Sequence, residues 1–110
     1  MDNRNVISIA KSFSVTPGSR YRKEGPFSGE EFRDDILKPA FDKALEENKK
    51  LIVSLDGTLG YGTSFLEEAF GGLARIYNNS KKVMDNIEII SIEEPYLKDD
   101  VLEYIEKANA

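Results

Sequence analysis

The sequence contains no cysteine and no histidine among its 110 residues. Without cysteine the chain has no disulfide, no thiol nucleophile and no thiolate ligand for a metal. Without histidine it lacks the side chain that most often transfers protons or binds zinc at neutral pH. These absences remove much of enzyme chemistry, and we expect a non-enzymatic protein with no catalytic residue, no metal site and no cofactor.

Long apolar runs are also missing, and so is an excess of basic charge. No apolar segment approaches the roughly 20 residues that cross a bilayer, and residues 1–5 lack the charged-then-apolar pattern of a signal peptide. Fifteen basic against twenty acidic residues give a net charge of -5, which disfavours binding to a phosphate backbone. We therefore expect a cytoplasmic protein that associates neither with membranes nor with nucleic acid.

The length and the 40% hydrophobic content predict one domain, residues 1–110, with a single core. Strand composition occurs at residues 6–9, 51–55 and 87–92, with residues 13–15 as a hairpin partner or an extension of the first strand. The segment 51–55 is apolar at nearly every position, which predicts a central strand covered on both faces.

Three further segments show helical periodicity. Ser28 begins the first with a capping-box pattern, and Pro39 within it predicts a kink or a break into two short helices. The second contains Gly71 and Gly72, which we attribute to close approach of a neighbouring backbone. Pro95 fits the first turn of the third. Strands that alternate with helices predict an α/β fold with a largely parallel sheet.

A glycine-rich segment, residues 56–68, joins the predicted central strand to the second helix. Three glycines fall within residues 57–62, and two hydroxyls stand where the helix should begin. Either Ser64 or Thr63 fits the capping position, and Glu67 completes a capping box for Ser64. Because unpaired N–H groups at a helix start attract anions, the glycines provide either a phosphate cradle or a sterically demanding turn.

A polar segment, residues 20–26, carries three basic residues and ends in a Gly-Pro pair, which is typical of an exposed loop. Short charge clusters of this kind are usually solvated. Its basic residues, Arg20, Arg22 and Lys23, are therefore either solvated charges or a contact for an acidic partner or a nucleotide phosphate.

Two motifs resemble a known family: GPFSGEEFR at residues 25–33 and SFLEEAFGGL at residues 64–73. With them, nearly the whole chain resembles the STAS-like domain of unknown function, a bacterial and phage-borne relative of the anti-sigma-factor antagonists. The resemblance implies a STAS-like α/β fold, with a mixed, mostly parallel sheet of four or five strands and helices packed chiefly on one face.

In the antagonists, a kinase-like anti-sigma factor phosphorylates a serine at the start of the helix after the central strand, and this switches partner binding off. Ser64 occupies the matching place with Thr63 beside it, whereas Gly62 stands where the antagonists have an aspartate. The resemblance thus implies Ser64, and secondarily Thr63, as the regulated hydroxyl, and a histidine-kinase-type ATPase as partner and kinase. We expect partner contacts at Asp56, Gly57, Thr58, Gly60, Tyr61, Gly62, Phe65, Glu67 and Glu68.

The leading hypothesis is a non-enzymatic regulatory module that docks on such an ATPase through this junction. The rival is a small-ligand or nucleotide sensor in which the loop of residues 57–64 binds phosphate directly. An enzyme fits the sequence least, because Ser64 has no neighbouring base other than carboxylates. A purely structural subunit is the remaining alternative.

Overall fold

A three-stranded parallel sheet forms the base of the structure, a computed structural model that describes residues 5–110. The strands β1 (Val6–Ser8), β2 (Leu51–Ser54) and β3 (Ile87–Ile90) lie in the order β1-β2-β3, with β2 central as predicted. Within these residues the sheet has no fourth strand and no antiparallel one, so the predicted count and the mixed character are not confirmed. Residues 1–4, which the single-domain and signal-peptide predictions include, lie outside the described part.

The segment 13–15 was predicted as a strand, and that prediction is wrong. The Ser8 hydroxyl accepts a hydrogen bond from a backbone N–H (3.2 Å) and begins the short helix α1 (Ile9–Ser12). Directly after it, the Phe13 ring packs against Phe32 at a centroid distance of 5.3 Å. The chain therefore turns toward the core and does not continue along the sheet.

The other elements are helical, and two of the predicted helices contain a π-helical turn between α-helical parts. The third predicted helix is present, and it begins directly after Pro95, which was predicted to lie in its first turn. A 3₁₀ turn in the polar loop and a short helix before β3 were not predicted. The elements are η1 (Arg22–Glu24), α2 (Gly29–Phe32), η2 (Arg33–Leu37), α3 (Lys38–Glu46), α4 (Thr63–Leu66), η3 (Glu67–Gly71), α5 (Gly72–Tyr77), α6 (Ser80–Asp85) and α7 (Tyr96–Lys107).

Pro39 lies in the first turn of α3, with the π-helical turn η2 directly before it. The chain stays helical from Gly29 to Glu46, so the predicted break into two helices is wrong. Proline is tolerated in a first turn, where its missing N–H is not needed. The wider turn η2 provides such a start inside a continuous helix.

The start of α2 lies very close to the helix that contains α4. The Ser28 hydroxyl caps α2 as predicted by accepting from the Glu31 N–H (3.0 Å), whereas the Glu31 carboxylate accepts from the Phe27 N–H (3.1 Å) and not from Ser28. A Cβ atom on Gly29 would lie 2.5 Å from the Phe65 carbonyl oxygen. Only glycine fits this close approach of two backbones.

Gly71 and Gly72 were expected to meet a neighbouring backbone, and that prediction is wrong. A Cβ atom on Gly72 would lie 2.7 Å from Arg33 Nη1, and one on Gly71 would lie 2.6 Å from Glu67 Oε2. The glycine pair therefore makes room for charged side chains that cross the helix surface.

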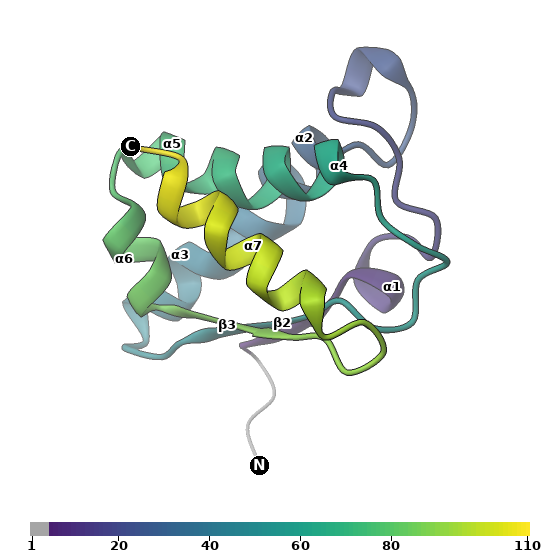
Figure 1. Cartoon of the computed structure of the whole chain (residues 1–110). Helices are drawn as coiled ribbons and strands as arrows, with labels where there is room; N and C mark the ends of the chain where they lie inside the picture. The colour runs from purple at the N-terminus through teal and green to yellow at the C-terminus, as the bar shows by residue number, and fades with distance from the viewer. Residues whose placement is uncertain (1–4) are drawn as a thin grey trace.

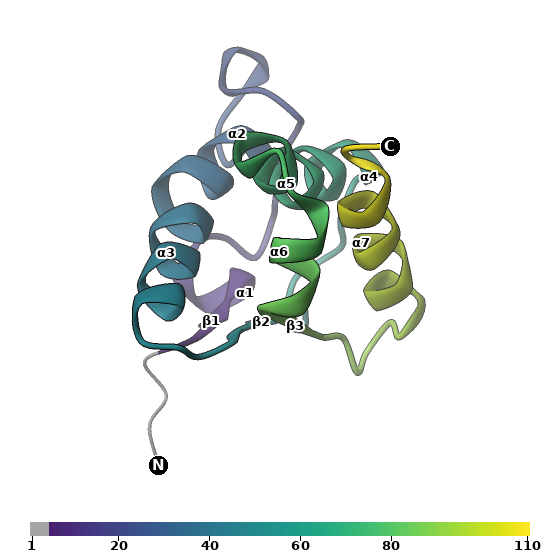
Figure 2. The same cartoon turned by 90° about the vertical axis from the view of Figure 1, so that its left-hand side faces the viewer.

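The helices all lie on one side of the sheet, as Figures 1 and 2 show. Val53 and Ile89 point into the core beneath them, whereas Val6, Ile52 and Glu88 form a row across the opposite face. No described element covers that opposite face, so the prediction that β2 is covered on both faces is wrong. The one-sided packing agrees with what the family resemblance implied.

The core between sheet and helices is rich in phenylalanine. Phe32 stacks on Phe65 at 5.9 Å with an interplanar angle of 28°, and it also meets Phe70 at 6.3 Å. These rings join the first helical run to the second and so fix the start of α4. Among residues 5–110, no helix has the length and apolar character needed to span a membrane.

Candidate functional site

Ser64 and Thr63 lie in the first turn of α4, past the loop that follows β2, and both are exposed. The residue before the helix is Gly62, with an extended backbone (φ -80°, ψ 148°), and no side chain caps this end. The prediction that Ser64 or Thr63 caps the helix is therefore wrong, because the helix begins earlier than expected and includes both. The Ser64 hydroxyl has no hydrogen-bond partner within residues 5–110.

Asp56 joins the loop after β2 to the loop after β3. Its carboxylate accepts hydrogen bonds from the backbone N–H groups of Ile92 (2.9 and 3.1 Å) and Glu93 (2.9 Å). The Glu93 carboxylate in turn accepts from the Gly57 N–H at 2.8 Å. Asp56 thus shapes the predicted junction by holding two loops together at the carboxyl edge of the sheet.

Tyr61 fixes the other end of the same loop. Its hydroxyl donates to the Leu55 carbonyl at 2.7 Å, and burial raises the pKa of Tyr61 to about 12. Gly57 (φ 95°) and Gly60 (φ 138°) have positive φ angles, which glycine adopts without strain. The Gly60 N–H faces the Thr58 hydroxyl at 3.3 Å. The glycines therefore serve the path of the loop, and their N–H groups at these two positions already have acceptors.

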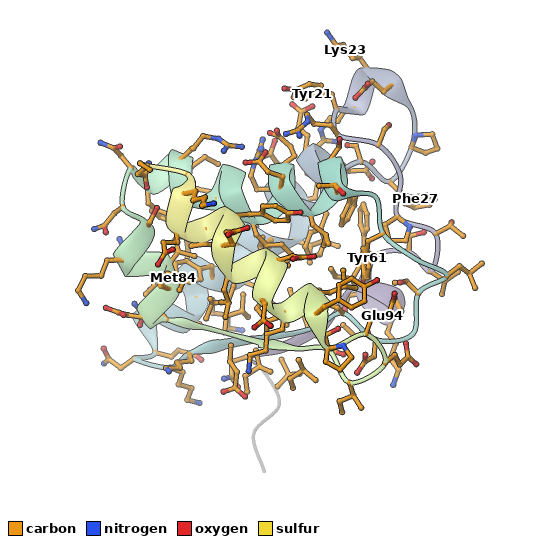
Figure 3. All side chains as sticks on the ribbon, in the orientation of Figure 1. Tyr21, Lys23, Phe27, Tyr61, Met84 and Glu94 are labelled. Carbon is orange, nitrogen blue, oxygen red and sulfur yellow. The ribbon has the colours of Figure 1, made fainter. Side chains whose placement is uncertain are left out.

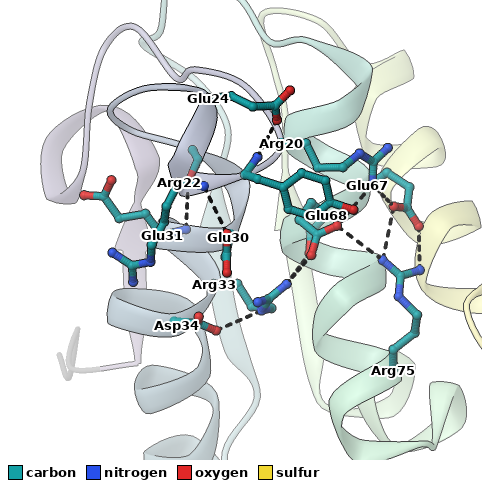
Figure 4. A network of polar contacts seen from close by, with 12 residues as sticks. Arg20, Arg22, Glu24, Glu30, Glu31, Arg33, Asp34, Glu67, Glu68 and Arg75 are labelled. Atoms are coloured by element: carbon teal, nitrogen blue, oxygen red, sulfur yellow. Dashed lines mark hydrogen bonds and ion pairs between the residues drawn. The ribbon is translucent and has the colours of Figure 1, made fainter.

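Three arginines hold the two glutamates that were predicted to contact a partner (Figure 4). Arg20 Nη1 donates to Glu67 (2.6 Å) and to Glu68 (3.1 Å). Arg75 donates to Glu67 at 2.7 and 3.1 Å, and these hydrogen bonds hold the pKa of Glu67 below its ordinary value. Arg33 Nη1 donates to Glu68 at 2.5 Å. We call these five residues the arginine–glutamate network.

The structure separates the three basic residues of the predicted contact. Arg20 belongs to the arginine–glutamate network, and Arg22 forms an ion pair with Asp35 at 2.8 Å. The Lys23 ammonium lies 5.8 Å from the centre of the Tyr21 ring and has no carboxylate partner in the part of the chain described. Figure 3 shows Tyr21 and Lys23 on the loop that projects from the body of the molecule. Of these three residues, Lys23 is therefore the one most available to another molecule.

The sequence reasoning missed three exposed aliphatic side chains near the junction. Leu59 is 83% exposed, Ile92 is 78% exposed and Val15 is 49% exposed. The Leu59 N–H donates to the Val15 carbonyl at 2.8 Å, so the segments that carry them are adjacent. The sequence did contain a signal for the exposure of Leu59, because this leucine stands in a glycine-rich loop. A residue that belongs to no strand or helix pattern has no buried face on which to lie.

The two motifs behind the family resemblance lie against each other in the structure. Gly29 of the first motif contacts the backbone at Phe65 of the second, and Arg33 of the first pairs with Glu68 of the second. Phe65 is fully buried in this contact, so it contributes to the core and not to the surface around Ser64. The motifs therefore specify how the two helical runs pack and where the hydroxyl is placed.

A family model described as a STAS-like domain of unknown function matches residues 28–97. The match includes β2 and β3, the junction with Ser64, and most of both motifs. A search of curated proteins and a search of solved structures returned no significant match. Because one family model covers most of its length, the chain belongs to the family of STAS-like domains of unknown function.

Proposed function

We propose that this chain is a non-enzymatic regulatory module that binds a histidine-kinase-type ATPase through residues 57–68 and is switched by phosphorylation of Ser64. The observation that carries the proposal is the state of the Ser64 hydroxyl: it is exposed, lies on a first helical turn and has no internal acceptor or donor in the described residues. A kinase reaches such a group without opening the fold. Thr63, the exposed neighbouring hydroxyl in the same turn, is the second choice.

Both carboxylates next to Ser64 along the helix are paired with arginines before any modification. The arginine–glutamate network begins one turn along the same helical run and pairs its carboxylates with guanidinium groups. A phosphate adds about two negative charges at pH 7, and a helix start tolerates them because of its partial positive charge. Phosphorylation would thus place a strongly hydrated dianion on the docking segment, and covering that group with a bound partner carries a desolvation cost, while the helix stays intact.

The rival function, a phosphate-binding nucleotide sensor, gains no support from the loop geometry. The Gly57 N–H donates to the Glu93 carboxylate, and the Gly60 N–H faces Thr58. Glu93 and Asp56 also place negative charge where a phosphate would bind. We expect isothermal titration of the isolated chain with ATP or GTP to give no binding heat.

The test first looks for a reading frame that encodes a histidine-kinase-type ATPase beside the gene for this chain, and then uses that ATPase with the purified chain. We expect ATP-dependent phosphorylation of the wild-type chain and none of Ser64→Ala. Ser64→Asp should bind the ATPase at least about tenfold more weakly, which corresponds to about 1.4 kcal/mol.

The matched control is Ser80→Asp, which places the same carboxylate in the first turn of α6. It should bind the ATPase as the wild type does. Equal binding by the wild type and Ser64→Asp, or phosphate on another residue, would contradict the proposal.

A further inference from the structure

Leu59 and Ile92 have the highest exposed fractions of the large hydrophobic side chains in residues 5–110, and Val15 adjoins Leu59. We call Val15, Leu59 and Ile92 the loop-tip surface. Each of them lies on the chain that follows a different strand, so the surface is at the carboxyl edge of a parallel sheet. Open parallel sheets bind other molecules at this edge, and exposed aliphatic groups there can serve as an interaction site.

Hydrogen bonds between the loops hold the loop-tip surface in place. The Leu59 N–H donates to the Val15 carbonyl at 2.8 Å, and the Ile92 N–H donates to the Asp56 carboxylate at 2.9 Å. The Gly57–Glu93 hydrogen bond adds a second link between the same two loops. A surface ordered in advance loses less conformational entropy when it binds.

The surroundings of the loop-tip surface are acidic. The loop segments 13–16, 55–62 and 91–95 contain three carboxylates, those of Asp56, Glu93 and Glu94, and no basic residue. The pKa of Tyr61 is raised mainly by burial, and the negative charges of Asp56, Glu93 and Glu94 add to this effect. This negative field disfavours a second copy of the chain and an anionic membrane as the occupant, and it favours a basic one.

We infer that the loop-tip surface docks a basic amphipathic segment of a partner protein, whose apolar side chains cover Leu59 and Ile92 while its basic side chains face the surrounding carboxylates. This inference rests on the proposed function, because it names the chemistry of the partner beside the same junction. The aliphatic contacts supply affinity, and the charges steer the approach and set the orientation. Ser64 follows Leu59 closely along the chain, so the aliphatic contact and the regulated hydroxyl lie on one continuous docking segment.

The test titrates a synthetic amphipathic helix of leucine and lysine into the isotope-labelled chain and follows the amide chemical shifts. We expect the shifts to centre on Val15, Leu59 and Ile92. Leu59→Ser and Ile92→Ser should each raise the Kd at least about tenfold. Both side chains are largely exposed, so both variants should fold normally.

The matched control is Ile76→Ser, which removes an exposed isoleucine from α5 and should leave the Kd unchanged. The same peptide with glutamate in place of lysine should not bind. Shifts centred elsewhere, or equal affinity for the wild type and Leu59→Ser, would overturn the inference. Vesicles of phosphatidylglycerol and phosphatidylcholine should not bind either, and vesicle binding that Leu59→Ser abolishes would overturn it in favour of a membrane.

The ATPase experiment separates this inference from the proposed function. ATPase binding that Leu59→Ser weakens at least about tenfold supports the inference. ATPase binding that Leu59→Ser leaves unchanged overturns it, while the proposed function stands. Peptide binding at the loop-tip surface with no ATPase binding supports the surface and counts against the proposed ATPase partner.

Discussion

At the scale of single residues, Glu68 is a carboxylate with little access to water whose two oxygens meet Arg20 and Arg33. Its replacement by alanine would leave Nη1 of the nearly buried Arg33 guanidinium without its carboxylate, and only Asp34, which pairs with Nε at 2.9 Å, would remain as a counter-charge. Loss of one member of a buried ion pair costs about 3–5 kcal/mol. We expect Glu68→Ala to lower the free energy of unfolding by about 3 kcal/mol, measured by urea denaturation.

Glu67→Ala is the matched control for this change. Glu67 is the neighbouring carboxylate of the same network but is more exposed to water. Ion pairs with such access to solvent contribute about 1 kcal/mol or less. Equal losses for Glu67→Ala and Glu68→Ala would show that burial does not set the strength of these pairs.

Ser64→Ala should leave the free energy of unfolding within about 0.5 kcal/mol of the wild type. The reason is that the Ser64 hydroxyl caps nothing, since the residue before α4 is Gly62. Ser28→Ala should cost about 1 kcal/mol, because the Ser28 hydroxyl accepts from the Glu31 N–H. Chemical denaturation of both variants makes the comparison, and a large loss for Ser64→Ala would reveal a role that the geometry does not predict.

These two serines show how far a single residue can be read from sequence. The cap at Ser28 was predictable because a serine three positions before a glutamate is a local signal. The same pattern at Ser64 misled, because the start of α4 depends on contacts from outside the segment. Asp56 and Tyr61 fix the loop and thereby place the first helical residue. The spacing of residues in the sequence does not predict such contacts.

At the scale of elements, the separation of the two helical runs depends on Gly29. We expect Gly29→Ala to destabilise the fold by about 1–3 kcal/mol, because a Cβ atom there would lie 2.5 Å from a backbone oxygen that has no freedom to rotate away. Gly72→Ala should cost less, since the nearest atom belongs to the end of the Arg33 side chain and alanine favours helix. Thermal or urea unfolding of the two variants decides the order, and a greater loss for Gly72→Ala would contradict it.

The existence of the main strands and helices was predictable, whereas their interruptions were not. Helix α7 and strands β2 and β3 follow from apolar periodicity and from Pro95. The π-helical turn before Pro39 accommodates the missing proline N–H within a continuous helix. The presence of a proline does not by itself predict such a turn. The atoms nearest to Gly72 belong to Arg33, which lies on another helix. The glycine therefore indicated a close contact, but the sequence did not identify the residue that makes it.

At the scale of the whole molecule, acid should weaken the fold in a defined window. Arg75 holds the pKa of Glu67 below its ordinary value, so the stability that Glu67 contributes is present above about pH 4.3, the ordinary value for glutamate. It is lost as the pH falls through the lower pKa of the folded state. Urea denaturation at neutral and acid pH should show a smaller acid loss for Glu67→Gln than for the wild type.

Arg75→Gln is the companion variant for this pH dependence. It removes the donor that lowers the pKa of Glu67, and it should reduce the acid loss in the same direction as Glu67→Gln. An acid loss identical in the wild type and both variants would contradict the assignment to this pair.

The architecture of the whole molecule was only partly predictable. Alternating strands and helices gave the α/β class and the parallel order. The apolar character of β2 predicted helices on both faces, but Ile52 lies on the face that no described element covers. An apolar residue indicates a tendency to be buried but does not indicate which element covers it. Composition therefore does not predict how many layers of helices pack on the sheet.

The Arg20 side chain connects the projecting loop to the second helical run. It belongs to the projecting loop with Tyr21 and Lys23, and it ends on Glu67 and Glu68 of the helical run that begins beside Ser64. A displacement of that helical run would therefore reach the projecting loop through the Arg20 side chain.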